Sequence, residues 1–155
     1  MKLRLTKQFS FEMAHALPDY PGKCHNIHGH SYKLFVTVEG EPAGVTDETG
    51  IHQRTGEAPI GMVIDFHQLK TIVEEAIVDR FDHALVLPRK EGDTSQTPDN
   101  LGGYQAKLIL VDFPPTTENL LIHFAQLLEG RLPEGTRLYS IKLYETETSC
   151  GELIL

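Results

Sequence analysis

Two neighbouring segments of the chain alternate between apolar and polar residues. In residues 3–15 the odd positions are apolar apart from Lys7, and this row ends at His15. In residues 28–38 the even positions form the apolar row, which begins with His28 and His30. A period of two residues is typical of a strand with one buried face. We therefore predict two strands, each with histidine at one end of its core-facing row.

Two later segments have the 3.6-residue period of amphipathic helices. The first is expected to begin at the N-cap Asp65 and to end near Arg80, with an apolar stripe of Leu69, Ile72, Val73, Ala76 and Ile77. The second follows a Pro-Pro-Thr-Thr sequence at residues 114–117, and its stripe contains Leu120, Leu121, Phe124, Leu127 and Leu128. Short strands are predicted at residues 107–112, 137–146 and 152–155, and a connection at residues 81–88.

This order of elements predicts a single α+β domain over residues 1–155, with an antiparallel β-sheet and two helices packed on one face. Two segments, near residues 41–60 and 89–106, lack periodicity and contain several turn-forming residues, so they are expected to be loop insertions. A small sheet leaves exposed edges, and closure into a β-barrel with other copies of the chain would remove them. We therefore expect an oligomer.

The composition argues against several classes of function. The 155 residues carry a formal net charge of −8, whereas nucleic acids and anionic membranes are bound by basic surfaces. The N-terminal segment lacks the continuous apolar stretch of a signal peptide or membrane span, so we expect a cytoplasmic protein. The two cysteines are too few for a disulfide scaffold, and Cys150 is expected to be an inert buried thiol.

Histidines on the two strand rows are candidate metal ligands. His28 and His30 are two residues apart in a predicted strand, so both project from the same face. His15 supplies a third imidazole from the other strand. Three neutral histidines with a fourth position open form a catalytic zinc site. Two alternatives stay open: ordinary core or surface histidines, and a closed structural site in which Cys24 is the fourth ligand.

Four other side chains could transfer protons or bind a ligand. A zinc ion near Cys24 would favour its thiolate and suit it to proton transfer. Asp82 and His83 pair a carboxylate with an imidazole, although a helix end with a surface histidine would have the same sequence. Glu145 either emerges into solvent or needs donors such as a guanidine-like ligand edge, because it completes the apolar row of Tyr139, Ile141 and Leu143.

Six segments together resemble the 6-pyruvoyl-tetrahydropterin synthase family. In chain order they are FEMAHALP, GKCHNIHGHSYKL, VIDFHQLK, FDHALVL, PPTTENL and LYETETS, and they span nearly the whole chain. The resemblance implies a tunnelling fold in which two trimeric rings stack into a homohexamer with sites formed between subunits. It also implies 7,8-dihydroneopterin triphosphate as the substrate.

The resemblance implies a role for each matching residue. His15, His28 and His30 would be the zinc ligands. The proton-transfer group would consist of Cys24, Asp82 and His83. Glu145 would anchor the pterin, and the pterin ring would also be contacted by Thr116 and Thr117. One departure concerns the loop of the Asp82–His83 pair, because the following Ala-Leu-Val-Leu lacks an asparagine that many members have nearby.

The spacing after Cys24 bears on the product. Three residues separate Cys24 from His28, which resembles the 6-carboxy-tetrahydropterin synthases of queuosine biosynthesis. That resemblance implies a lyase that forms 6-carboxy-5,6,7,8-tetrahydropterin and releases acetaldehyde and triphosphate. The alternative within the family is a 6-pyruvoyl-tetrahydropterin synthase, which eliminates triphosphate. The alternative from another class is a non-catalytic zinc-binding oligomer.

Overall fold

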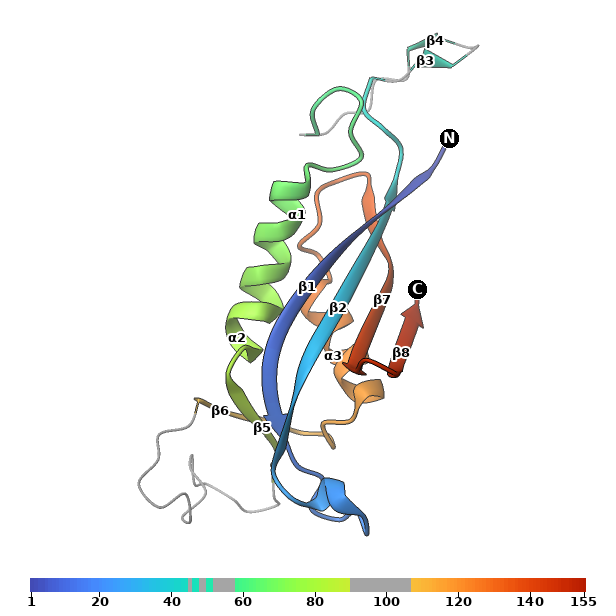
Figure 1. The fold of residues 1–155 in the computed structure, drawn as a ribbon. Coiled ribbons are helices and arrows are strands. Elements are labelled where there is room, and N and C mark those ends of the chain that lie inside the picture. Colours follow the sequence, from blue (N-terminus) through green and yellow to red (C-terminus); the bar gives the residue numbers. More distant parts are fainter. Residues whose placement is uncertain (45, 48–49, 52–57, 90–106) are drawn as a thin grey trace.

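The computed structural model describes residues 1–44, 46–47, 50–51, 58–89 and 107–155. Six strands form one strongly twisted sheet in the order β6-β5-β1-β2-β7-β8 (Figure 1). Their bounds are β1 Leu3–His15, β2 His28–Gly40, β5 Ala84–Pro88, β6 Lys107–Val111, β7 Thr136–Thr146 and β8 Ser149–Ile154.

The two long strands at the N-terminus form the centre of this sheet. β1 and β2 pair antiparallel along their whole length, and a 3-10 turn over Lys23–His25 lies in the connection between them. Their register sets His15 opposite His28 and Met13 opposite His30. The two predicted strands are therefore confirmed, and their histidines meet at one end of the ladder.

Both predicted helices are present and pack on one face of the sheet (Figure 1). The first runs without a break through α1 (Phe66–Val73), a π-helical segment (Glu74–Val78) and α2 (Asp79–Phe81). The second is α3 (Thr117–Leu128). Their N-caps are Asp65, which accepts a hydrogen bond from the His67 amide, and Thr116, which accepts one from the Asn119 amide. Each cap satisfies a backbone N–H that has no partner within the helix.

The core lies between the helices and the sheet. The largest fully buried side chains include Tyr32, Leu34, Leu69, Phe81 and Phe124. At the C-terminal edge β8 lies close against α3, because Gly151 has no side chain: a Cβ there would lie 2.9 Å from Leu121 Cδ1. The apolar rows and helix stripes predicted from the sequence thus converge on one core.

The sheet is mixed, so the prediction of an antiparallel sheet was wrong for the edge formed by β5 and β6. Residues 84–88, expected to be part of a connection, form β5, which pairs parallel with both β1 and β6. The continuous run Ala-Leu-Val-Leu has no alternation because both of its faces are covered. The α+β class and the helices on one face are confirmed.

Tyr139, expected on the apolar row of β7 with Ile141 and Leu143, does not face the core. The pairing of β2 with β7 shifts so that Thr37 faces Ser140 while Val38 faces Leu138, which is a bulge at Tyr139. Leu138 packs against the core in its place. Tyr139 instead lies under the guanidinium of Arg4, whose central carbon is 3.6 Å from the ring centroid.

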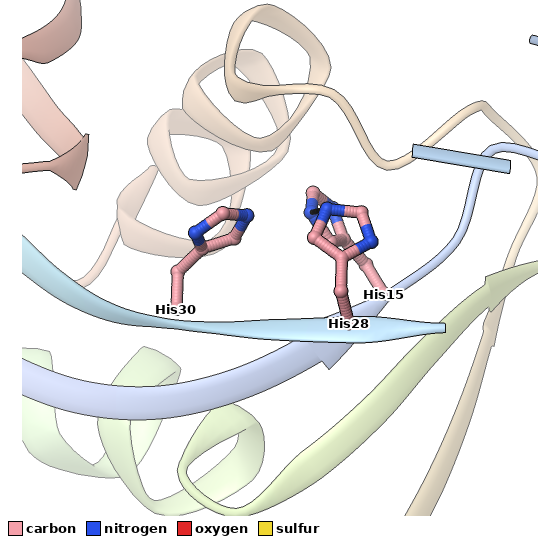
Figure 2. Close-up of side chains that lie close together, drawn as sticks. All are labelled: His15, His28 and His30. Carbon is pink, nitrogen blue, oxygen red and sulfur yellow. Dashed lines mark hydrogen bonds between the residues drawn. The ribbon is translucent and has the colours of Figure 1, made fainter. Parts of the chain in front are cut away.

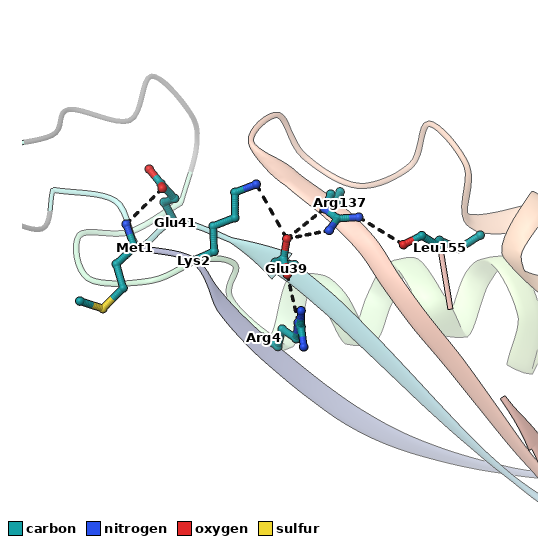
Figure 3. Close-up of polar contacts among 7 residues, drawn as sticks. All are labelled: Met1, Lys2, Arg4, Glu39, Glu41, Arg137 and Leu155. Carbon is teal, nitrogen blue, oxygen red and sulfur yellow. Dashed lines mark hydrogen bonds and ion pairs between the residues drawn. The ribbon is translucent and has the colours of Figure 1, made fainter. Parts of the chain in front are cut away.

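A buried carboxylate joins β1, β2 and β7 at the end of the sheet away from the histidines. Glu39 accepts hydrogen bonds from Arg4 at 3.0 Å and from Arg137 at 2.8 Å, and Lys2 lies 3.9 Å away (Figure 3). Its side chain is 7% exposed. Charge-assisted bonds from two arginines offset the cost of burying this charge.

Parts of both expected insertions lie outside the described residues. In the first, β3 (Thr46–Asp47) and β4 (Gly50–Ile51) form a two-stranded hairpin. In the second, residues 90–106 are not described. None of the helices in the described ranges has the length and apolar character needed to cross a membrane.

Candidate active site

Three imidazoles from β1 and β2 converge on one point. One nitrogen from each of His15, His28 and His30 lies within 4.8 Å of the other two. Figure 2 shows the three rings gathered on the same side of β2. His15 is 2% exposed, and the other two are partly buried. The cluster follows from the strand register, because cross-strand neighbours and residues i and i+2 share one face.

Backbone carbonyls fix how two of these rings are protonated. His15 Nδ1 lies 2.8 Å from the Pro115 carbonyl oxygen, and His28 Nδ1 lies 2.8 Å from that of Asn26. A carbonyl only accepts, so each Nδ1 carries the proton and each neutral ring has a lone pair on Nε2. The two Nε2 atoms are 3.1 Å apart. Two lone pairs at this distance repel unless a cation lies between them.

The cluster fits a metal ion of the kind that histidine binds. Among the residues that the structure describes, none forms a hydrogen bond with the buried His30 Nε2, which leaves a third nitrogen ready to donate to a metal. Burial is the main cause that lowers the pKa of His15, and it keeps that imidazole neutral, as a ligand must be. Hydrogen bonds from Nδ1 to carbonyls are the usual outer support of a metal-bound histidine. The described residues can therefore hold a metal ion through three nitrogens.

The cysteine proposed as a fourth ligand is not part of this cluster. Among the described residues, the group whose ligand atoms lie within 4.8 Å of one another contains the three histidines and no sulfur. Cys24 is partly buried in the turn that precedes β2. Its carbonyl oxygen accepts a hydrogen bond from the amide of Leu17, two residues after His15, so its turn lies beside the histidine end of the strands. This arrangement favours an open site with a thiol beside it over a closed shell.

Glu145, at the end of β7, points toward the histidines. Its Oε1 lies 3.4 Å from His15 Nε2 and 3.6 Å from His30 Nε2, and its side chain is 28% exposed. The N-terminus of α3 borders the same region, since the carbonyl that supports His15 belongs to Pro115. The next two residues are Thr116, whose hydroxyl caps the helix, and Thr117, whose methyl packs against Gly151.

The pair of Asp82 and His83 lies apart from the histidine cluster. Asp82 Oδ2 is 2.9 Å from His83 Nδ1, and its Oδ1 accepts a hydrogen bond from the Glu12 amide. The Glu12 amide, followed by His83, holds the pKa of Asp82 below its usual range. His83 has a positive φ of 59° and lines a cavity of about 440 Å³ with Glu12, Ser31 and Lys107. Glu12 and Ser31 point to the face of the sheet opposite the three histidines, and the cavity is also lined by His30 at the edge of the cluster.

Known proteins match both the sequence and the fold of this chain. The 6-pyruvoyl tetrahydropterin synthase family matches residues 4–153. The chain belongs to this family. A Haemophilus influenzae relative named 6-carboxy-5,6,7,8-tetrahydropterin synthase is 37% identical over 151 residues, which cover 96% of each chain.

Two solved structures share the fold of this member of the 6-pyruvoyl tetrahydropterin synthase family. The Caenorhabditis elegans 6-pyruvoyl tetrahydropterin synthase has a TM-score of 0.64 and 22% identity, covering 100% of this chain and 96% of its own. An uncharacterised protein from Wolinella succinogenes has a TM-score of 0.72 and 19% identity, covering 99% and 98%. The family resemblance found in the sequence is therefore confirmed.

Two residues of the site were not singled out from the sequence: Tyr32, beside the histidine cluster, and Lys107, beside the turn that contains Asp82. Tyr32 is fully buried against the histidines, and its position two residues after His30 on the same row could have revealed it. Lys107 donates to the carbonyls of Asp79 at 2.6 Å and Asp82 at 3.0 Å, a long-range contact without a sequence signal. The expectation for Cys150 was wrong, because this thiol is exposed on the edge strand β8.

Proposed function

We propose that this chain is a zinc-dependent lyase that converts 7,8-dihydroneopterin triphosphate and water to 6-carboxy-5,6,7,8-tetrahydropterin, acetaldehyde and triphosphate, a reaction of queuosine biosynthesis. The observation that carries the proposal is the cluster of three imidazoles with a carboxylate beside it. The printed name of the Haemophilus influenzae relative supports the carboxy product. The three-residue spacing after Cys24 supports the same choice.

The side chains around the histidine cluster would have three roles: binding zinc, transferring protons and anchoring the pterin. His15, His28 and His30 would hold zinc, which when bound polarises the hydroxyl groups of the substrate side chain and lowers their pKa. Cys24 would move protons between the side chain and the ring, because it borders the cluster without joining it. Glu145 would bind the amino-pyrimidine edge of the pterin and fix its orientation. Contacts to the ring would also come from Thr116 and Thr117.

The Asp82–His83 pair would serve the site of a neighbouring subunit. His83 is 77% exposed and is not part of its own histidine cluster, so its imidazole is available to another chain. Asp82 holds the ring by Nδ1, which leaves Nε2 to exchange a proton. We propose a cytoplasmic homohexamer, a dimer of trimers, in which barrel closure brings His83 of one subunit to the zinc site of the next.

Product analysis tests the proposed reaction. Purified zinc-loaded protein is incubated with 7,8-dihydroneopterin triphosphate, and the products are separated and identified by mass. The carboxy-pterin with an equal amount of acetaldehyde is expected. A pyruvoyl-pterin with triphosphate and no acetaldehyde would instead assign the alternative activity of the same family. No turnover by the zinc-loaded hexamer would favour a non-catalytic zinc protein.

Mixed oligomers test whether sites form between subunits. His28→Ala and His83→Ala each remove one part of the site and are expected to be inactive alone. Unfolding and refolding them together should restore part of the activity, because some interfaces then combine an intact zinc site with an intact His83. Refolding each variant alone is the control. If the mixture stays inactive while forming hexamers, both groups act within one chain.

A further inference from the structure

Tyr32 carries a buried hydroxyl group close to the proposed metal ligands. The residue is 0% exposed, and its oxygen is unpartnered among the described residues. Its ring stacks on Phe11 and meets the rings of His15 and His30 edge to face, with centroids 6.3 Å and 5.7 Å away. Enclosing an unpaired hydroxyl costs free energy that phenylalanine at the same position would not.

This hydroxyl lies among the groups of the proposed pterin site. Lys33 faces Tyr144 in the register of β2 and β7, so the next residues on each strand, Tyr32 and Glu145, are cross-strand neighbours. Burial raises the pKa of Tyr32 well above its ordinary value, and the Glu145 carboxylate raises it further. Glu145 is thus close enough to act on the hydroxyl both by its charge and as a hydrogen-bond acceptor, although their contact in this structure falls short of a hydrogen bond of ordinary geometry.

Glu145 needs a donor that the histidines cannot supply. The tautomer fixed by Pro115 puts a lone pair on His15 Nε2, the atom that lies 3.4 Å from Glu145 Oε1. A metal held by the cluster would also occupy the facing nitrogen of His30. Neither nitrogen can then donate a proton to the carboxylate. The Tyr32 hydroxyl is a donor in the same place and is not otherwise used.

We propose that Tyr32 is a positioning residue for Glu145. When a pterin binds, the carboxylate turns from the imidazoles toward the amino-pyrimidine edge, and the Tyr32 hydroxyl donates a hydrogen bond that holds it in the plane of that edge. This inference rests on the proposed role of Glu145 as the pterin anchor. It assigns a use to a buried hydroxyl that lacks a partner among the described residues.

A double-mutant cycle tests the inference with Tyr32→Phe, Glu145→Gln and the double variant. Binding of unsubstituted pterin to the zinc-loaded protein is measured by fluorescence titration. Tyr32→Phe should weaken binding about 10-fold and Glu145→Gln about 10- to 100-fold, as expected for hydrogen bonds to a charged group. The double variant should bind no more weakly than Glu145→Gln, because Tyr32 acts through that carboxylate.

Stability and metal content separate this role from a structural one. Tyr32→Phe should keep its zinc, and its Tm should be unchanged or higher, because no bond of the free protein is lost. Tyr144→Phe is the matched control: this ring packs against Phe35, on the other face of β7, and pterin binding should not change.

Each contrary result has a separate meaning. Normal pterin binding by Tyr32→Phe, with weakened binding by Glu145→Gln, would overturn this inference and leave the anchor intact. Normal binding by Glu145→Gln would remove the anchor and the inference with it. Additive losses in the double variant would show that Tyr32 does not act through Glu145. A lower Tm for Tyr32→Phe would show that its hydroxyl is bonded in the free protein.

Discussion

Removing and restoring zinc should change the stability of the protein in a way that depends on three named side chains. A ligand that binds only the folded state stabilises it by RT ln(1 + [L]/Kd), which is about 2.7 kcal/mol at a free zinc concentration 100 times Kd. About 1 kcal/mol shifts Tm by roughly 2–4 °C in a domain of this size. Zinc should therefore raise the Tm of the stripped protein by about 5–11 °C.

Two histidine variants make this measurement specific to the proposed site. His28→Ala removes one of the three nitrogens that lie within 4.8 Å of one another, so its Tm should not respond to zinc. His67→Ala is the control, because this exposed residue uses only its backbone in the α1 cap. Scanning calorimetry is run at one protein concentration, since subunit association would also shift Tm. An equal zinc response in all three proteins would refute the assignment of the metal ligands.

Cys24→Ala should keep its zinc while kcat falls on the order of 10²-fold, because a proton carrier is lost and the ligands are not; an unchanged kcat would exclude this role. Hydrogen bonds from Arg137 and Arg4 hold the pKa of Glu39 below its usual range, so its stabilising effect is present above pH 4.5 and lost as the pH falls through the folded-state pKa. Glu39→Gln should accordingly lower Tm near pH 7 and reduce its fall under acid; an unchanged profile would contradict this. Burial, then the charge of Arg80, lowers the pKa of His123, so stability should fall as the pH drops below its ordinary pKa of 6.5. His123→Gln should show a smaller loss of Tm between pH 7 and 5.5 than wild type, and an equal loss would count against the buried neutral imidazole.

Local patterns predicted those parts of the fold that depend on nearby residues. Strand β1 and the cap at Asp65 were predicted because alternation and capping are properties of a few consecutive residues. The parallel strand β5 was missed because a run covered on both faces has no period to detect. The bulge that turns Tyr139 away from the core was missed because it depends on the register against β2.

The candidate site was predictable for a similar reason, and only in part. His15, His28 and His30 lie on rows that a simple hairpin register brings together, so their convergence follows from the alternation alone. The apolar row that Glu145 ends also indicated its inward direction. By contrast, no sequence pattern relates Tyr32 to Glu145 or Lys107 to the Asp82 turn, because those contacts arise from tertiary pairing between distant segments.

The metal cluster lies at the end of the β1–β2 ladder for a physical reason. A carbonyl that accepts from the second nitrogen of a ligating imidazole fixes its tautomer, and carbonyls inside a sheet or helix are already engaged by backbone N–H groups. The acceptors used here belong to Asn26, just before β2 begins, and to Pro115, just before α3 begins. Three histidines of the same row in the middle of the ladder would have the right spacing but no such acceptors. The two histidines with fixed tautomers therefore lie where strands end and free loop carbonyls are within reach.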